Sequence, residues 1–481
     1  MLSPAKKRVV LGAALFVVFV LIVVPYINIE KYSGYVGSSL GQALGRNVTV
    51  QKVQLKTFPV PGLLMHGVEI SDDPSISAEP MLRDDSEDGV LASLRLSSLW
   101  RGRLEIAKLT LNYPSLNLAR AADGRWNIES VLERVRQTPA APTVNKRPES
   151  RPRFPYIEVN NGRINLKIGQ EKKVFALGEA DLALWSPAEN EWRMRLEAKP
   201  IRTDANLSDT GTIKLEGSWK RASQLRETPV SFKFWWDEGQ LGQLTRLIYG
   251  ADRGWRGGVR ISGLVLGTPE NLKIVTDARL DDFRRYDIAT GESLVLQTHC
   301  DAFYNLSQRL FHDLYCQSPI GGGTTLVRGN LATSPQNQSL DLSLTAENIS
   351  AQFLTTLARH MKKNLPEDIS TTGAMSASLA VRAAADGIRV WTGDAKISAL
   401  QVRSSVLEKP LLIEPTTWRL IGPGTSQFVP PSSKAKKLLA QQRMPQPDSP
   451  AFSFDPIAIP AGGSSPATLR GWFSRRNFDA E

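Results

Sequence analysis

Apolar and polar residues alternate along most of this chain, and short turn-rich stretches interrupt the alternation. Residues 104–120, LEIAKLTLNYPSLNLAR, alternate, break at Tyr113 and Pro114, and then alternate again. This period of two predicts β-strands with one face buried. Further strands are predicted at residues 174–185, 192–198, 212–219 and 230–235. We therefore expect a mainly β protein.

The first thirty residues follow a different pattern. Lys6, Lys7 and Arg8 precede a charge-free run that begins at Val9 and extends to about Ile27, long enough to cross a bilayer as a helix. A cleaved signal peptide is the alternative, but no small-x-small cleavage site follows the run. We expect a single-pass anchor at residues 9–27 with a cytoplasmic N-terminus, so that the bulk of the chain lies outside the cytoplasm.

The residues after the run predict a small β module. A short helix is expected at Tyr35–Leu44, ended by Gly45, and strands are expected from Val48 onward. The acidic stretch Ser71–Asp88 is expected to be too polar to pack. Near its end the module carries Trp126, which we expect to anchor a short amphipathic helix on the sheet rather than to bind a ligand.

Several motifs of this module occur in an order that resembles the AsmA family of inner-membrane-anchored periplasmic proteins. They are Gly45-Arg46, Asp72-Asp73-Pro74, SLWRGRLEI at 98–106, Tyr113-Pro114 and Gly124-Arg125-Trp126-Asn127. The resemblance covers residues 1 to about 136 well and the rest more loosely. It implies an elongated, curved, mostly antiparallel β-sheet with a trough that holds lipid acyl chains.

Composition divides the chain into segments. Residues 137–153 are rich in proline and charge and predict a linker. We expect a cytoplasmic tip and anchor at 1–29, the N-terminal β module at 30–136, a repeated β-sheet domain with few short helices at 154–420, and a Pro/Ser-rich, partly disordered tail with a final strand at 421–481. Asn161-Gly162 predicts a two-residue hairpin turn.

An internal repeat with a period of about 110 residues lies in the larger domain. Leu244 and Leu247 on a predicted short helix correspond to Leu354 and Leu357, and the strands that follow each helix also correspond. Each copy should be a block of several strands with one helix. Stacked blocks of alternating strands would present a continuous apolar face.

The net charge of +11 raises the question of nucleic-acid binding, but lysine and arginine are scattered among acidic residues and form no basic stripe. A solvated β surface is the better interpretation. We find no nucleophile elbow, no phosphate-binding glycine loop and no His-Glu-x-x-His motif. We expect no enzymatic activity, no cofactor and no nucleic-acid partner.

Two cysteines and two histidines lie close together, at His299, Cys300, His312 and Cys316. Their spacing superficially allows a zinc site, whereas a hairpin turning near residues 305–309 would place the cysteines on paired strands. A disulfide between Cys300 and Cys316 is favoured in an oxidising compartment, with free thiols and zinc as the alternatives.

Alternation alone selects a tentative set of trough residues, which a one-residue register slip would move to the opposite face. The set is Val53, Leu55, Leu94, Leu96, Leu109, Leu111, Leu116, Leu118, Ile164 and Leu166. Core packing beneath a helix is the alternative role. We expect a periplasmic lipid-binding protein that supports phospholipid transport and outer-membrane biogenesis. The alternatives are a scaffold for outer-membrane assembly factors that carries no lipid, and a metal-dependent hydrolase.

Overall fold

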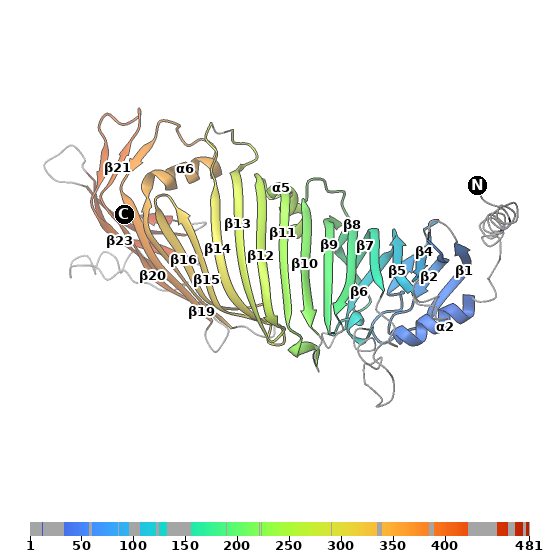
Figure 1. Ribbon diagram of the computed structural model, residues 1–481. Helices are drawn as coiled ribbons and strands as arrows, with labels where there is room; N and C mark the ends of the chain where they lie inside the picture. The colour runs from blue at the N-terminus through green and yellow to red at the C-terminus, as the bar shows by residue number, and fades with distance from the viewer. Residues whose placement is uncertain are drawn as a thin grey trace, which may run out of the picture. The chain divides into compact units, whose positions relative to one another are not determined.

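The computed structural model in Figure 1 describes most of the chain. The described residues are 12, 33–56, 60–84, 86–95, 106–121, 125–131, 155–188, 190–220, 222, 224–289, 291–333, 339–383, 389–421, 450–459, 467–474 and 478–480. The predicted linker at 137–153 and all of the predicted anchor at 9–27 except residue 12 lie outside them. Within the described residues, no helix has the length and apolar character that a membrane crossing requires.

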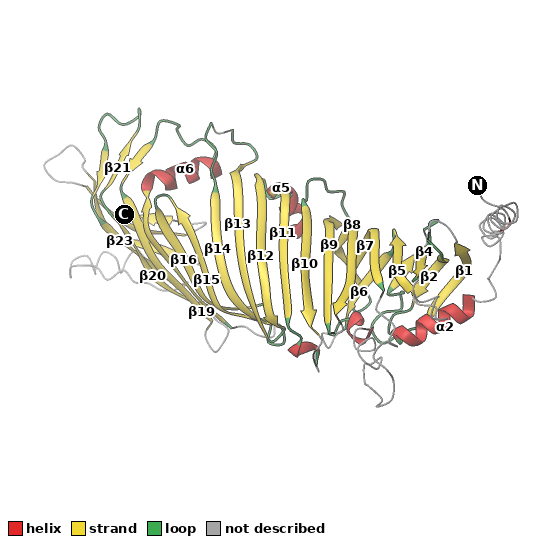
Figure 2. Cartoon of the chain, viewed as in Figure 1, coloured by secondary structure: helices red, strands yellow, loops and turns green. Residues whose placement is uncertain are grey.

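The chain forms two compact units, which are described separately. Unit 1 contains residues 1–223, 230–239 and 243–251, and unit 2 contains the remainder. Strands dominate both units, and the helices are short (Figure 2). The predicted fold class is therefore confirmed in its mainly β, mostly antiparallel character.

Unit 1 begins with a helix and continues as a sheet. Its elements are α2 (Ser33–Leu44), β1 (Val48–Lys56), β2 (Gly62–Ile70), β3 (Leu82–Asp84), β4 (Val90–Leu94), β5 (Ile106–Asn112), β6 (Ser115–Arg120), β7 (Tyr156–Ile168), β8 (Glu171–Ala188), β9 (Glu191–Arg202), β10 (Thr212–Lys220), β11 (Val230–Gln240) and α5 (Leu241–Tyr249). The predicted helix ending at Gly45 and the four predicted strands from β8 to β11 are confirmed.

Strands β5 and β6 are two halves of one line. Both pair in parallel with β7, Asn112 opposite Asn160 and Ser115 opposite Arg163. The break between them falls at Tyr113, whose φ of 56° is left-handed. β7 belongs to the sequence after the predicted linker, so the strands on both sides of that segment share one sheet.

The predicted hairpin at Asn161-Gly162 is wrong. β7 runs through both residues, and Asn161 takes a φ of 56° within a β-bulge. Its backbone N–H donates to the Asp181 carboxylate on β8 at 2.8 Å. A left-handed asparagine serves a bulge as well as a turn, which is why the dipeptide alone was misleading. The chain reverses instead at Gly169 and Gln170.

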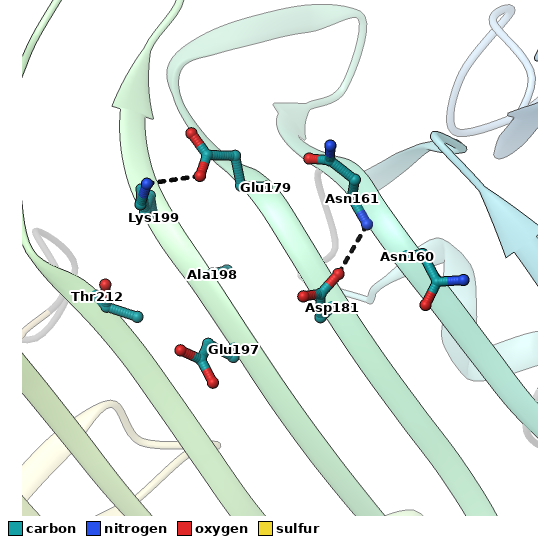
Figure 3. A pocket seen from close by; sticks show the side chains of 8 residues that line it. All are labelled: Asn160, Asn161, Glu179, Asp181, Glu197, Ala198, Lys199 and Thr212. Atoms are coloured by element: carbon teal, nitrogen blue, oxygen red, sulfur yellow. Dashed lines mark hydrogen bonds and ion pairs between the residues drawn. The ribbon is translucent and has the colours of Figure 1, made fainter.

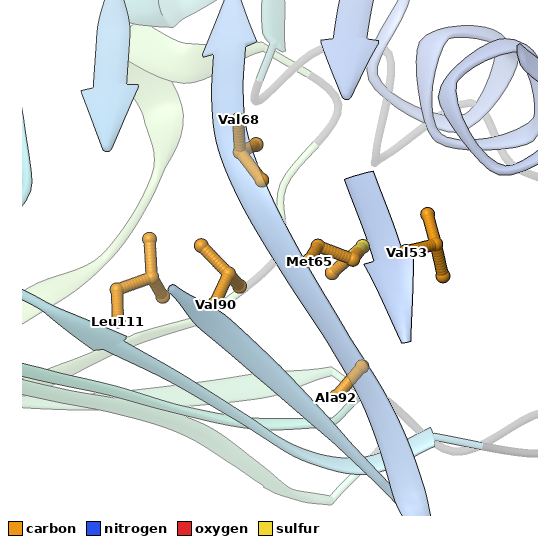
Figure 4. Packing of buried hydrophobic residues seen from close by; sticks show 6 residues of the cluster. All are labelled: Val53, Met65, Val68, Val90, Ala92 and Leu111. Atoms are coloured by element: carbon orange, nitrogen blue, oxygen red, sulfur yellow. The ribbon is translucent and has the colours of Figure 1, made fainter. Parts of the chain in front are cut away.

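A closed hydrophobic core lies beneath α2 at the start of unit 1. Figure 4 shows its buried members, Val53, Met65, Val68, Val90, Ala92 and Leu111. Val36 and Leu40 of α2 pack against this cluster. Strands β1, β2, β4 and β5 together with α2 therefore form a core of the ordinary two-layer kind.

The acidic stretch Ser71–Asp88 packs, contrary to the prediction. Ile76, Met81 and Asp84 are buried, and β3 pairs with both β2 and β6. Some polar residues of this stretch bond to one another: Asp84 accepts from the Ser86 hydroxyl at 2.6 Å, and Asp73 accepts from the Ser75 hydroxyl at 2.7 Å. Local side-chain bonding of this kind lets a polar segment enter a core.

Unit 2 contains antiparallel strands of the large sheet, a helix and a small three-stranded sheet (Figure 1). Its elements are a 3-10 turn at Leu225–Glu227, β12 (Trp255–Thr268), β13 (Asn271–Arg285), β14 (Leu296–Asn305), β15 (Leu310–Ile320), β16 (Gly323–Ala332), β17 (Leu340–Ser350), α6 (Ala351–Met361), β18 (Ser370–Thr372), β19 (Ala374–Ala383), β20 (Arg389–Ile397), β21 (Leu400–Arg403), β22 (Leu411–Ile413), β23 (Thr416–Ile421), β24 (Ala451–Ile459), β25 (Ala467–Ser474) and β26 (Phe478–Ala480).

The internal repeat is present in the structure. α5 directly follows β11 and precedes the hairpin β12–β13, and α6 directly follows β17 and precedes the hairpin β19–β20. The short strand β18 is an addition to the second copy. The corresponding segments are thus one strand, one helix and one hairpin, and strands β14 to β16 lie between them.

Part of the predicted Pro/Ser-rich tail is ordered sheet. β24 pairs with β23, and β25 pairs with β24. Pro456 sits at the register shift between Phe454 and Ile457, where a missing N–H is tolerated. The proline-rich composition therefore concealed a bulged strand.

Candidate functional site

One face of the unit 1 sheet is apolar from strand to strand. Leu182 on β8 faces Leu196 on β9, which faces Leu215 on β10 and then Phe234 on β11. The adjacent register line is Ala183, Arg195, Glu216 and Lys233, on the opposite face. The first line is apolar and the second is charged except at Ala183, because successive side chains of a strand point to opposite faces.

Unit 2 repeats this arrangement over eight strands. One register line crosses β12 to β20 through Gly263, Thr276, Cys300, Cys316, Val327, Leu344, Leu379 and Gly393. The next line crosses the same strands through Ser262, Asp277, His299, Gln317, Leu326, Thr345, Ser378 and Asp394. The first line is apolar or small, and the second is polar except at Leu326.

We call these surfaces the unit 1 apolar face and the unit 2 apolar face. Most of their larger side chains, among them Met194, Leu215 and Leu342, are only half-buried. The small residues between them, such as Ala302 and Ala346, are buried. A contiguous apolar surface left half-exposed is a binding surface rather than a finished core.

Aromatic rings stack at one end of the unit 1 apolar face. The rings of Trp192 and Trp219 lie 6.1 Å apart and almost parallel, and Phe232 lies 6.2 Å beyond Trp219. Trp236 lies toward the other end of β11, and its indole N–H donates to the Thr210 carbonyl at 2.8 Å. Such rings add apolar surface while their edges remain compatible with polar groups.

Helix α6 crosses one edge of the unit 2 sheet. Ser350 caps its first turn by accepting from the Phe353 N–H, and Phe353 lies over Gly321 in the turn between β15 and β16. At the far end, His360 is 2% exposed and its ring nitrogens lie 2.8 Å from the Thr356 carbonyl and 3.1 Å from the Glu292 carbonyl. His360 is therefore buried and joins α6 to the β13–β14 connection.

The cysteine and histidine cluster is not assembled as a metal centre. Cys300 and Cys316 are joined by a disulfide, at facing positions on β14 and β15 within the unit 2 apolar face. His299 is on the opposite face between Asp277 and Asp301, and these two carboxylates raise its pKa, chiefly through the hydrogen bond to Asp277. In the described part of the chain, no group of three or more histidine, cysteine or acidic side chains is placed to hold a metal ion.

The tentative trough residues lie mainly in the first strands, and the structure separates them. Val53 and Leu111 are buried in the closed core of Figure 4, and Leu109 packs against it. Ile164 packs with Leu196 in a cluster on the unit 1 apolar face. The remaining described members, half-buried on β1, β4, β6 and β7, are Leu55, Leu94, Leu116, Leu118 and Leu166, whereas Leu96 lies outside the described residues.

Sequence reasoning predicted strands β8 to β11 but did not locate the apolar faces on them or on the strands of unit 2. The signal was available in EWRMRLEAKP at 191–200 and LDLSLTAE at 340–347, where apolar and polar residues alternate strictly. Without the register, however, alternation does not reveal which neighbouring strands align their apolar positions.

A hollow of about 440 Å³ lies on unit 1 (Figure 3), but its lining is polar. The Glu179 carboxylate pairs with Lys199 at 2.6 Å, and Asp181 accepts from Asn161. Glu197 pairs with Lys214 at 3.2 Å. Because charged and polar side chains line it, this hollow does not suit an acyl chain.

Three of the motifs that carry the family resemblance, those with Arg46, Asp72 and Asn127, meet in one buried polar cluster in unit 1. The Asn127 amide is fully buried and donates to the Asp72 carboxylate at 2.7 Å and to the Asn117 carbonyl at 2.8 Å, while its oxygen accepts from the Ala119 N–H at 3.1 Å. Arg46 donates to the Asn127 carbonyl at 3.2 Å. Trp126 is half-buried beneath the Arg120 guanidinium, so the neighbouring asparagine is the more constrained residue.

Two charged groups extend this cluster. Arg46 lies 3.5 Å from Asp73, and hydrogen bonds from Ser75 hold the Asp73 pKa below its usual value. Lys167 is 1% exposed, and its ammonium donates to the Ser77 hydroxyl at 2.9 Å and lies 3.1 Å from Glu79. Every contact of this cluster joins parts of unit 1, so we assign the cluster to holding the module together.

Comparisons with known proteins support the same assignment of the N-terminal region. No curated protein and no solved structure gave a significant match to the chain. Residues 3–197 match the model of the AsmA family, a range that contains α2, β1 to β8 and most of β9 together with the whole polar cluster. The match confirms the AsmA resemblance for residues 3–197, the N-terminal part of the chain.

Proposed function

We propose that this chain is an inner-membrane-anchored periplasmic protein that binds lipid acyl chains on its apolar faces. In this role it supports phospholipid transport and outer-membrane biogenesis, and it carries out no catalysis. The observation that carries the proposal is the pair of adjacent register lines in unit 2, one apolar and one polar across eight strands.

The dimensions of this surface suit an acyl chain. Eight strands at a spacing of roughly 4.8 Å give a row on the order of 30 Å long. A bilayer core of about 30 Å is two acyl chains deep, so one row accommodates at least one extended chain. Each methylene that leaves water contributes about 0.8 kcal/mol, which supplies a driving force without a pocket that reads a headgroup.

The decisive experiment compares two neighbouring residues of β17. Leu342 belongs to the apolar face and pairs with Gly329 and Val381, whereas Ser343 belongs to the polar face. We would purify the full-length chain without added lipid and quantify co-purifying phospholipid by lipid extraction and mass spectrometry. Leu342→Glu should lose most of the bound phospholipid, and Ser343→Glu should retain it.

Circular dichroism of both variants controls for unfolding. A folded wild-type chain that carries no phospholipid would overturn the proposal. It would favour the second candidate, a scaffold for outer-membrane assembly factors, whose apolar faces would pack against protein. Equal lipid loss in both variants would also count against the apolar face as the binding surface.

A further inference from the structure

Large apolar side chains are exposed at one edge of the unit 2 sheet. This edge holds the connection from β13 to β14, the end of α6, and the hairpin of β21 and β22 (Figure 1). Its exposed apolar side chains are Tyr286, Val295, Met361, Val406, Leu407 and Leu412. Val406 is 80% exposed and Tyr286 is 65% exposed, so neither contributes to a core.

Separate contacts hold these segments in place. The His360 ring ties the end of α6 to the Glu292 carbonyl, which places Met361 beside the β13–β14 connection. Asp368, just before β18, accepts from the Ser405 N–H and the Ser404 hydroxyl of the hairpin. These bonds lower the Asp368 pKa to about 2. Arg256 lies over the Tyr286 ring at 5.8 Å. Hydrogen bonds and a cation–π contact therefore hold the segments that carry the exposed side chains, which we call the apolar tips.

The arrangement fits a lipid surface better than a protein partner. A protein interface requires one contiguous packed area, whereas a bilayer accepts separate apolar tips between polar residues. Cations flank the tips, with Lys362 and Lys363 after Met361, and Arg403 and Lys409 on either side of Val406 and Leu407. Lysine and arginine beside apolar tips attract anionic lipid headgroups.

We infer that this edge of unit 2 docks on a bilayer surface, with Val406 and Leu407 inserted among the lipids. The inference goes beyond the proposed function, because an edge can dock on a bilayer whether or not the apolar faces carry lipid. Docking would bring the unit 2 apolar face next to the membrane that supplies or receives the lipid.

The test uses an environment-sensitive fluorophore on the full-length chain, held in an amphipathic polymer without detergent. Val406→Cys carries the label, and the native cysteines are protected in their disulfide. The matched control is Leu306→Cys, because Leu306 is 52% exposed in the β14–β15 turn at the opposite edge. The probe membranes are vesicles of phosphatidylethanolamine with phosphatidylglycerol.

Vesicles should shift the emission of the label at position 406 to shorter wavelength and leave the label at 306 unchanged. In the unlabelled chain, Val406→Asp should weaken vesicle binding about tenfold, the consequence of losing roughly 1.4 kcal/mol of apolar insertion. No shift at either position, or equal shifts at both, would overturn the inference. Lipid co-purification is measured separately, so its failure does not mimic either result.

Discussion

The first strands of unit 1 and the strands of unit 2 differ in how far their apolar side chains are covered. In the first strands of unit 1, α2 covers one cluster of buried side chains, and a network centred on Asn127 joins the loops to the sheet. In unit 2, Leu344 and Leu379 face each other on a surface that is only half-buried. The comparison separates a module that completes its own core from a sheet whose apolar face stays half-exposed.

The difference has a consequence for stability. A closed core loses free energy whenever a buried group is removed, because a cavity or an unpaired polar group remains. A half-exposed face loses less, because water already reaches it. Substitutions in the two regions should therefore differ in magnitude, and only those on the open face should depend on lipid.

The largest effect is expected at Asn127. Asn127→Leu removes one partner each from the Asp72 carboxylate, the Asn117 carbonyl and the Ala119 N–H. The change should cost about 3 kcal/mol, because the buried Asp72 carboxylate keeps only the bond from the Asp73 N–H. Urea unfolding followed by hydrogen exchange of β6 and β7 measures the loss. Asn206→Leu, at an exposed loop position, is the control and should change little. Equal protection in both variants would show that the cluster does not hold the module together.

The next effect compares the two surfaces directly. Met65 is 3% exposed in the closed core, and Met65→Ala should cost about 3 kcal/mol. Leu342→Ala on the unit 2 apolar face should cost only about 1 kcal/mol in the lipid-free chain, since its side chain is half-buried. Unfolding of both variants with and without added phospholipid tests this contrast. A lipid-independent cost at Leu342 as large as that at Met65 would remove the distinction between the two regions.

A smaller effect is expected at the disulfide within the unit 2 apolar face. Cys300 and Cys316 close a loop with a sequence separation of 16, and removing such a cross-link costs about 2 to 3 kcal/mol in chain entropy. The double variant Cys300→Ser, Cys316→Ser should lower hydrogen-exchange protection in β14 and β15 and leave the first strands unchanged. Loss of protection across unit 1 would contradict the separation of the two regions.

The sequence predicted much of this fold because strand alternation is local. The strands from β8 to β11, the helix before Gly45 and the repeat around α5 and α6 all follow from periods that short segments display. The predicted turn at Asn161-Gly162 is wrong because a left-handed asparagine fits a bulge as well as a hairpin. The sequence did not predict that residues 71–88 pack, because some of their buried polar groups bond to residues distant in sequence, such as Asp72 to Asn127.

The candidate site was less accessible from sequence than the fold. Val53 and Leu111 show the same alternation as the residues of an open face, but both are buried in the core that α2 packs against. Leu342 and Leu344 alternate identically, and only the register with β16 and β19 shows that their face continues across the sheet. Alternation identifies strands with one apolar face, whereas the covering of that face is decided by elements far away in the sequence.

The smallest predicted effect concerns pH on the polar face of unit 2. His299 lies 2.7 Å from an Asp277 oxygen and 3.2 Å from an Asp301 oxygen, and its pKa is raised above 6.5, first by the hydrogen bond to Asp277. A raised folded-state pKa means that this stabilisation is fully present below about pH 6.5 and is lost as the pH rises through the folded value. The ring is 47% exposed, so solvent screening should keep the contribution below about 1 kcal/mol.

Titration of the His299 imidazole by NMR measures this shift, and hydrogen exchange of β13 and β14 between pH 6 and pH 8 reports its effect on the local structure. His299→Gln should abolish the pH dependence of that exchange and leave lipid co-purification unchanged, because His299 faces away from the apolar line through Cys300 and Cys316. A change in bound lipid with His299→Gln would mean that the two faces of the sheet are coupled. The polar face would then contribute to binding, and the distinction between covered and open surfaces would no longer describe unit 2.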